Sequence, residues 1–196
     1  MRIIRQSDFT VTPWKNGGGL TREALRVPPR GDPFHWRVSV AQIDRSGPFS
    51  EFAAYNRTMV LLRGSGVDLT CANGERHRLR NIGELIEFDG AQAMQCELEA
   101  GPCVDLNLIA SKSLRAVHAR VHRLQEPLAV PAVGAASTLI FPVDAAVSVR
   151  SAGGDVAGLE PWDLGVRCAG SRDEFTLAPC RGSAPVLVFL ATVTEA

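Results

Sequence analysis

The feature that most constrains this chain is an alternation of apolar and polar side chains with a period of two residues. Residues 36–41, 67–70 and 104–108 all alternate in this way. Such a period places successive side chains on opposite faces of a β-strand. Two short runs that are apolar throughout, 59–62 and 186–190, are typical of strands buried on both faces. The pattern therefore predicts an all-β fold.

Turn-forming residues separate these segments at intervals of about eight to twelve residues, as in β-sandwiches and β-barrels. Asn73-Gly74, between two alternating segments, is the strongest hairpin signal. Evidence for helices is thin: residues 111–124 fit a helix, but the same segment fits a strand equally well. The other turn signals are Gly47-Pro48, Gly64-Ser65-Gly66, Gly101-Pro102 and Gly153-Gly154.

A weak internal repeat indicates that one β-unit occurs twice. Residues 59–69 resemble residues 138–149, each copy leads to a glycine turn and then to an apolar strand, and the offset is about eighty residues. We therefore expect residues 1–112 to form an N-terminal unit that carries the site. Residues 113–196 are expected to form a linker strand and a C-terminal unit, and the two units together one compact domain.

The two copies differ in their last strand. In the first copy, Asp105 and Asn107 share the face opposite Leu106 and Leu108, whereas the corresponding strand of the second copy is apolar on both faces. Burying Asp and Asn is costly unless they are paired, so an inward polar face would mark a binding cavity. The first unit would then hold the cavity and the second would be dry. The alternative is that both polar side chains face water.

Charge and hydropathy exclude several classes of protein. The 21 Lys and Arg residues balance 21 Asp and Glu residues, so the chain lacks the positive field of a non-specific nucleic-acid binder. The longest apolar run, 186–191, is far shorter than the roughly 20 residues that span a bilayer. The N-terminus lacks the apolar core of a signal peptide. We therefore expect a cytoplasmic protein with neither nucleic acid nor a membrane as partner.

Metal binding and nucleophilic catalysis have no signature in the sequence. The five cysteines form no CxxC pair, which favours buried thiols in a reducing compartment. His118 and His122 have the spacing of a helical zinc site, but on a strand they would lie about 13 Å apart. Neither HExxH nor GxSxG is present. We expect no metal, no cofactor and no catalytic nucleophile.

Residues 14–23 are the densest cluster with binding chemistry. Three consecutive glycines let backbone N–H groups approach a ligand closely, although the spacing is that of neither a P-loop nor a dinucleotide site. The residues before them could supply a flat wall, a charge and an amide. The competing interpretation is a flexible loop with a packing tryptophan. The residues concerned are Trp14, Lys15, Asn16, Gly17, Gly18 and Gly19.

Two arginines are candidate anion ligands. Arg37 and Ser39 share one face of a predicted strand. If that strand lines the same cavity as Asp105, Arg37 would bind a small carboxylate through its planar guanidinium. Otherwise Arg37 is exposed, or forms a structural ion pair with Asp105. Arg57, just before the buried strand 59–62, is either a second anion ligand or a solvated cap.

Taken together and in order, these motifs resemble the HutD/Ves family. The resemblance runs to about residue 110 and rests on residues 14–21, 36–39, 47–50 and 105–108, with Arg57. The family is similar to RmlC-like cupins, with two β-barrel units in one chain (a bicupin), which agrees with the internal repeat. The resemblance implies a link to histidine utilisation, with urocanate or formylated glutamate intermediates as ligands.

The resemblance also implies a ligand pocket in the first barrel. One departure concerns residues 54–57, where the family commonly has Gly-x-Asp-Arg and this chain has Ala-Tyr-Asn-Arg. We therefore expect Arg57 to lack an orienting carboxylate. The metal-binding cupin signature is absent, so metal-dependent dioxygenase or isomerase chemistry is not expected. The implied pocket residues are Trp14, Asn16, Gly17, Gly18, Gly19, Thr21, Arg37, Ser39, Arg57, Asp105 and Asn107.

Three functional classes are compatible with these observations. The leading one is a metal-free protein that binds a small carboxylate and regulates or buffers histidine utilisation. The second is a metal-independent cupin isomerase, epimerase or hydrolase that uses Asp105 as a base with His35 or Lys15, although no acid partner is evident. The third is a protein-interaction scaffold. By analogy with cupins, which commonly dimerise, a homodimer is expected.

Overall fold

The computed structural model describes residues 1–180 and 185–195, and the chain divides into two compact units. We call Phe9–Ser113 the first barrel, and Leu114–Ala196 together with Met1–Asp8 the second barrel. The sequence-based division placed residues 1–8 in the first unit. They belong to the second because β1 (Arg2–Ile4) pairs with β17 (Leu164–Arg167) of that barrel.

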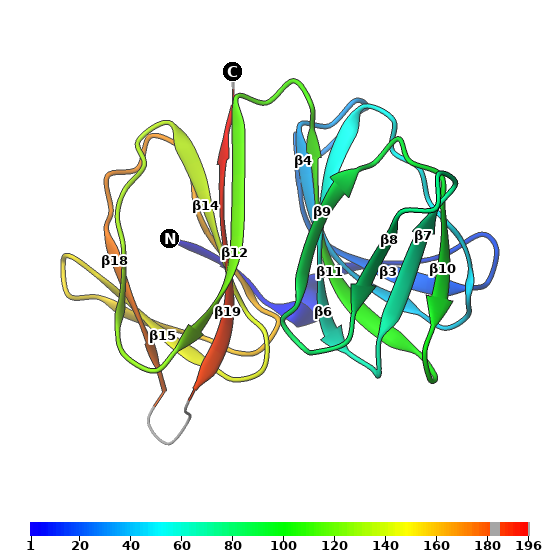
Figure 1. Ribbon diagram of the computed structural model, residues 1–196. Helices are drawn as coiled ribbons and strands as arrows, with labels where there is room; N and C mark the ends of the chain where they lie inside the picture. The colour runs from blue at the N-terminus through cyan, green and yellow to red at the C-terminus, as the bar shows by residue number, and fades with distance from the viewer. Residues whose placement is uncertain (181–184, 196) are drawn as a thin grey trace. The chain divides into compact units, whose positions relative to one another are not determined.

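The first barrel consists of two facing antiparallel sheets (Figure 1). The larger has the strand order β2-β3-β4-β11-β6-β9 and the smaller has the order β5-β10-β7-β8. The strands are β2 (Thr10–Pro13), β3 (Gly19–Val27), β4 (Trp36–Ile43), β5 (Gly47–Phe49), β6 (Tyr55–Arg63), β7 (Val67–Cys71), β8 (Arg76–Leu79), β9 (Leu85–Asp89), β10 (Met94–Leu98) and β11 (Cys103–Ser111).

The second barrel has the same construction. Its sheets have the orders β1-β17-β14-β19-β12 and β13-β18-β15-β16, and a short 3-10 helix, η1 (Gln6–Asp8), follows β1. Its other strands are β12 (Ala116–Leu124), β13 (Leu128–Val130), β14 (Ala136–Pro142), β15 (Val147–Ser151), β16 (Val156–Leu159), β18 (Phe175–Pro179) and β19 (Val186–Thr194).

The strand orders confirm the internal repeat. The series β9-β6-β11-β4 of the first barrel corresponds to β17-β14-β19-β12 of the second, and β5-β10-β7-β8 corresponds to β13-β18-β15-β16. Asn73-Gly74 and Gly153-Gly154 lie in equivalent hairpins, β7–β8 and β15–β16. The segment 111–124, which fitted a helix or a strand, contains strand β12. The all-β prediction is confirmed.

The core of the first barrel lies between its two sheets. Met59 and Leu61 from β6 face Val67 and Leu69 from β7, and all four are fully buried. These side chains explain the apolar run at 59–62: β6 is a central strand whose two faces are both buried. Apolar packing fills this part of the barrel and leaves the polar ends of β4 and β11 to line a cavity.

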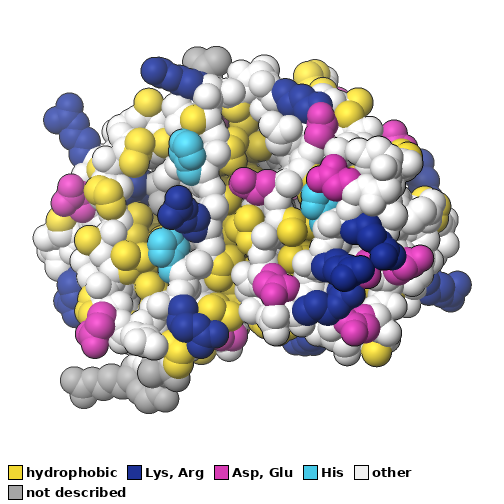
Figure 2. Space-filling model, in the orientation of Figure 1, with side chains coloured by type: hydrophobic (Ala, Val, Ile, Leu, Met, Phe, Trp, Pro, Cys, Tyr) yellow, Lys and Arg dark blue, Asp and Glu magenta, His cyan; other side chains and the backbone are white. Residues whose placement is uncertain are grey.

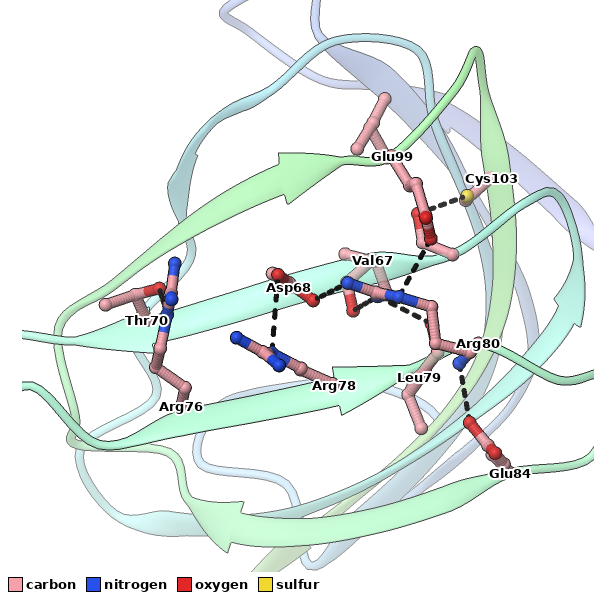
Figure 3. Close-up of polar contacts among 12 residues, drawn as sticks. Val67, Asp68, Thr70, Arg76, Arg78, Leu79, Arg80, Glu84, Glu99 and Cys103 are labelled. Atoms are coloured by element: carbon pink, nitrogen blue, oxygen red, sulfur yellow. Dashed lines mark hydrogen bonds and ion pairs between the residues drawn. The ribbon is translucent and has the colours of Figure 1, made fainter.

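A network of ion pairs and hydrogen bonds lies on the outward face of the β7–β8 hairpin (Figure 3). Arg80 Nη2 lies 2.5 Å from Asp68 Oδ1, and Arg80 Nε lies 2.8 Å from Glu99 Oε2. Arg80 Nη1 also donates to the carbonyl of Val67 at 3.3 Å. These pairs are partly exposed, where such interactions contribute about 0–1 kcal/mol each. None of these residues lines the cavity described below, so we interpret the network as structural.

Basic and acidic side chains are interspersed on the face shown in Figure 2, in keeping with a net charge of zero. Among the described residues, no helix has the length and apolar character needed to cross a membrane.

Candidate functional site

A cavity of about 620 Å³ opens in the first barrel, within the size range of small-molecule sites. Seven of the residues predicted for the site line it: Trp14, Asn16, Thr21, Arg37, Ser39, Arg57 and Asn107. The other four, Gly17, Gly18, Gly19 and Asp105, do not.

Strand register brings residues far apart in the sequence onto one inner surface. β11 lies between β4 and β6, and Asn107 is opposite Ser39 of β4. One step along the same face, Ile109 lies between Arg37 of β4 and Arg57 of β6. Because side chains alternate along a strand, all five point to the same side of the sheet. The two arginines therefore flank one strand at the cavity wall.

Arg57 is a buried cation held in one orientation. Its side chain donates from Nη1 to the carbonyl of Ser50 at 3.0 Å and from Nη2 to Asn107 Oδ1 at 2.5 Å. Its exposed fraction is only 5%, which contradicts the solvated cap. The guanidinium is also surrounded by aromatic rings, whose centroids lie at 4.3 Å for Phe49, 5.2 Å for Phe88 and 5.3 Å for Phe52.

The electrostatics of Arg57 favour an anion. Burial lowers its pKa to about 10, while the nearby Asp105 opposes that change, so the guanidinium is charged at neutral pH. Its Nε is buried and has no hydrogen-bond partner. A buried donor without a partner is unfavourable, and a ligand oxygen would supply one.

Arg37 is neither exposed nor paired with Asp105. Its side chain is 19% exposed, and its Nη1 lies 3.9 Å from Glu23 Oε2. The guanidinium lies 5.4 Å from the Phe52 ring centroid and 5.5 Å from that of Phe34. Burial lowers the pKa of Arg37, and its Nε is buried without a hydrogen-bond partner. Both arginines therefore carry unused donors.

Asp105 lies within the barrel wall and not on the cavity surface. It is fully buried, which excludes the alternative that this carboxylate faces water. Its Oδ1 accepts a hydrogen bond from Asn107 Nδ2, while its Oδ2 has no partner. Burial raises the pKa of Asp105 to about 7, although Arg57 and Asn107 both act to lower it. Asn107 thus links the carboxyl group of Asp105 to the guanidinium of Arg57.

The glycines shape the β2–β3 turn and are not part of the cavity surface. Trp14 N donates to the Gly19 carbonyl at 2.9 Å, and Gly17, with φ of +66°, donates to the Trp14 carbonyl at 3.0 Å. Gly18 N donates to Asn16 Oδ1 at 3.0 Å. The backbone N–H groups of Gly17 and Gly18 are therefore used within the turn, which leaves ligand contacts to the side chains around it.

Trp14 is fixed by the strand that follows the turn. Its Nε1 donates to Thr21 Oγ1 at 2.8 Å, and its ring packs against the core of the barrel. A Cβ on Gly19 would lie 2.0 Å from the backbone oxygen of Gln42 and 3.2 Å from Trp14 Cε3. Gly19 is therefore needed for the close approach of β3 to β4 under the tryptophan ring.

Several cavity residues were not predicted as site residues. Strand alternation could have predicted two of them: Glu23 lies two positions after Thr21, and Ile109 lies two positions after Asn107, so each shares a face with a predicted residue. The others are Thr12, Pro13, Ala41, Pro48, Phe49, Ser50 and Phe52, and the lining also includes Lys15, which the sequence had offered as the charge of the 14–23 cluster. The lining thus carries three cations, Lys15, Arg37 and Arg57, against the single carboxylate of Glu23. This donor-rich set suits an oxyanion and not a metal ion.

The departure at Asn56 does not disturb Arg57. Asn56 is exposed and is the neighbour of Arg57 on β6, so its side chain points to the opposite face of the strand. A carboxylate at position 56 could not orient the guanidinium directly. Asn107 and the Ser50 carbonyl hold it instead.

The second barrel lacks the acidic residue of the first. On β19, Val188 is opposite Pro142, as Asp105 is opposite Leu61 in the first barrel, and the carbonyls of Leu61 and Pro142 accept equivalent hydrogen bonds from Gly83 N and Trp162 N. Val188, which is fully buried, thus stands where the first barrel has Asp105. The expectation of a dry second unit was nevertheless too simple, because Arg167 is buried there. Its terminal nitrogens donate to Asp173 O, Pro131 O and Thr138 Oγ1 at 2.6–2.8 Å.

Two β-barrels of the same construction in one chain make up a bicupin fold. The oxalate decarboxylase of Lactobacillus farciminis (formate complex) shares this fold, with a TM-score of 0.69 at 9% identity over 99% of this chain and 86% of that one. A sequence model of the HutD family matches residues 6–178. The chain belongs to the HutD family.

Individual relatives agree with this assignment. An uncharacterised 21.2 kDa protein in the hutC 3′ region of Pseudomonas putida is 35% identical over 167 residues, which are 83% of this chain and 84% of that protein. Protein Ves of Escherichia fergusonii is 34% identical over 100 residues, 50% of this chain and 52% of Ves. The resemblance to the HutD/Ves family is confirmed.

Two solved structures are similar along nearly the whole chain. HutD from Pseudomonas fluorescens SBW25 (formate condition) has a TM-score of 0.81 and 27% identity, covering 100% of this chain and 99% of that one. A conserved protein of unknown function from Pseudomonas aeruginosa PAO1 has a TM-score of 0.89 and 28% identity, covering 99% and 98%.

Proposed function

We propose that the first barrel binds a small carboxylate and that the protein is a non-enzymatic regulator or buffer of histidine utilisation. The observation that carries this proposal is the pair of partly desolvated guanidinium groups, Arg37 and Arg57, on one wall of the cavity. Each has a buried Nε without a hydrogen-bond partner. Guanidinium binds carboxylate through two parallel N–H donors.

The neutral groups of the cavity suit the rest of such a ligand. Ser39 and Asn16 offer hydroxyl and amide groups, while Trp14, Phe49 and Phe52 provide apolar surface. A planar or short-chain carboxylate with one further polar group would use both kinds of contact. Urocanate and formylglutamate-like molecules have this chemistry.

The relatives support the same interpretation. The P. fluorescens HutD structure represents a formate condition, and formate is the simplest carboxylate. The P. putida relative is encoded in the hutC 3′ region, which connects the family with a hut locus. We extend both features to this chain as part of the proposal.

The rival enzymatic hypothesis gains little from the geometry. A general base must reach its proton directly or through one water. Asp105 is fully buried and already accepts a hydrogen bond from Asn107, and neither Asp105 nor His35 lines the cavity. Lys15 does line it. Turnover in a substrate screen would favour the enzyme, and binding without turnover favours the regulator.

A ligand screen tests the proposal. Thermal unfolding would be followed with urocanate, formylglutamate, formiminoglutamate, histidine and glutamate. A ligand at 100 times its Kd should add about 2.7 kcal/mol to stability, which raises Tm by several degrees in a chain of this size. No shift with any of the five would contradict a ligand from histidine degradation.

Arg37 provides a specific test within that screen. Arg37→Ala should weaken binding of the selected carboxylate by about 1.5–3 kcal/mol, the contribution of a charge-assisted hydrogen bond. Isothermal titration calorimetry measures this change. An affinity equal to that of the unmodified protein would remove Arg37 from the binding site.

The pH dependence of binding follows from Asp105. Its pKa is raised to about 7, so the carboxyl group ionises as pH rises through neutrality and then offsets the charge of Arg57. Carboxylate affinity should therefore fall as pH increases from 6 to 8. A coupling of about one pKa unit, or 1.36 kcal/mol, predicts a fall approaching tenfold. Asp105→Asn should flatten the profile; a slope unchanged in this variant would exclude Asp105 as its source.

The raised pKa of Asp105 also predicts that ligand binding is coupled to proton uptake. Asp105 protonates more readily in the folded chain than in the unfolded chain, since its pKa is raised from 3.8 to about 7. Its contribution to stability is fully present below pH 3.8 and is lost as pH rises through about 7. A bound anion favours the protonated form further, so binding near pH 7 should take up protons. Calorimetry in buffers of different ionisation enthalpy measures this uptake.

A further inference from the structure

The inner face of the β7–β8 hairpin gathers three side chains that ligate metals. Cys71 ends β7, and its N–H donates to the carbonyl of Glu75 at 2.8 Å, so these residues face each other across the turn. His77 follows two positions later on β8, opposite Leu69. Because side chains alternate along each strand, Cys71, Glu75 and His77 lie on the same face.

The other face of the hairpin carries the charged residues drawn in Figure 3. Asp68, Thr70, Arg76 and Arg78 alternate with the three candidate ligands along the two strands. The cluster is therefore separate from the arginine network on the outside of the barrel.

The turn holds the three ligand atoms close together. Gly74, with φ of +88°, donates to the Cys71 carbonyl at 2.9 Å, and Glu75 N donates to Asn73 Oδ1 at 3.0 Å. One ligand atom from each of Cys71, Glu75 and His77 lies within 4.8 Å of the others. Glu75 Oε1 and His77 Nε2 are 3.7 Å apart. A small movement would place all three around one ion.

The histidine has a buried nitrogen without a partner. His77 Nε2 is shielded from solvent and makes no hydrogen bond among the described residues. Its ring stacks on Phe88, with centroids 5.9 Å apart, which fixes the direction of the imidazole. A buried polar atom without a partner is destabilising. Coordination to a metal would satisfy it.

We propose that Cys71, Glu75 and His77 bind one divalent transition-metal ion, and that their thiolate, imidazole and carboxylate donors select Zn²⁺. On binding, the Cys71 thiol transfers its proton to solvent and its sulfur bonds to the metal. Gln92 Oε1, 3.8 Å from Cys71 Sγ, or a water fills the fourth position. None of the three ligands lines the carboxylate cavity, so this site is independent of the proposed function.

Metal titration of the full chain tests this proposal. Chelator-treated protein would be titrated with Co²⁺, followed by its absorption spectrum, and the Co²⁺ then displaced with Zn²⁺. We expect one ion per chain and a thiolate-to-Co²⁺ charge-transfer band. Cys71→Ser should abolish the band and weaken Zn²⁺ binding more than about 100-fold, because even changes outside the ligand shell cost 10–100-fold. Glu75→Gln and His77→Gln should each weaken it at least about tenfold.

Matched controls come from exposed residues of the second barrel. Cys168→Ser and His118→Gln replace the same residue types outside the cluster and should leave affinity and spectrum unchanged. A missing band, a band retained in Cys71→Ser, or an equal loss in Cys168→Ser would overturn the proposal. If Cys71→Ser does not fold, His77→Gln decides: Zn²⁺ should raise the Tm of this variant less than it raises that of the unmodified chain.

Discussion

Replacing Arg57 with alanine should weaken carboxylate binding by about 2 kcal/mol or more, which is roughly 30-fold or more. Arg57 is the most buried cation of the cavity, and its orientation is fixed by Asn107 and the Ser50 carbonyl. A ligand bound to it is shielded from competing water. Titration calorimetry with the carboxylate selected in the ligand screen would measure the loss.

Two further variants separate charge from geometry. Arg57→Lys keeps the positive charge but lacks the planar donor pair, so we expect most of the affinity to be lost. Arg22→Ala removes an arginine from β3 at a position between the cavity residues Thr21 and Glu23, on the opposite face of that strand, and should bind normally. Equal binding by Arg57→Ala and the unmodified protein would contradict the proposed site.

Arg57→Ala also leaves the carboxyl group of Asp105 without its compensating charge. Breaking a buried pair by removing one partner is strongly destabilising. We therefore expect Asp105 to be protonated in this variant at neutral pH. Combining Arg57→Ala with Asp105→Asn should restore stability but not binding, so thermal unfolding and calorimetry together distinguish a folding defect from a binding defect.

Replacing Gly19 with alanine should destabilise the protein by about 3 kcal/mol, the upper end of the usual range for overpacking. The added Cβ would lie 2.0 Å from the backbone oxygen of Gln42. A backbone oxygen on a paired strand cannot move aside as a side chain can. β3 would have to separate from β4, and Trp14 would lose its position. Urea-induced unfolding measures the change in free energy.

Gly47→Ala is the matched control for this substitution. Gly47 lies in β5, and a Cβ there would meet no atom within 4 Å. Its stability should stay within about 0.5 kcal/mol of the unmodified protein. Similar destabilisation by both substitutions would show that the close contact with Gln42 is not the cause.

Much of the fold could be predicted because strands leave a local pattern in the sequence. Alternation identified β4, β7 and β11, and the Asn-Gly turn identified the β7–β8 hairpin. The place of residues 1–8 could not be predicted, because the pairing of β1 with β17 joins segments more than 150 residues apart. No local periodicity reports such a contact.

In the site, too, local alternation could be predicted from the sequence, whereas contacts that depend on the packing of strands could not. Alternation placed Arg37 and Ser39 on one face, and Asp105 and Asn107 on one face. It could not show that Asp105 lies below the cavity surface while Asn107 reaches it, because that depends on the depth of β11 within the barrel. Gly17, Gly18 and Gly19 were predicted to contact the ligand because their role in the turn under Trp14 depends on the register of β3 against β4, which the sequence does not show.

The buried polar residues of β11, Asp105 and Asn107, have a thermodynamic consequence for the protein as a whole. The second barrel, with the fully buried Val188 at the place of Asp105, shows that this architecture is completed by an apolar side chain there. A buried carboxyl group with an unpartnered oxygen lowers stability relative to such a residue. The first barrel thus gives up stability at the position that tunes its guanidinium. A duplicated fold accommodates this trade-off between stability and activity, since the sacrifice is confined to one of two copies.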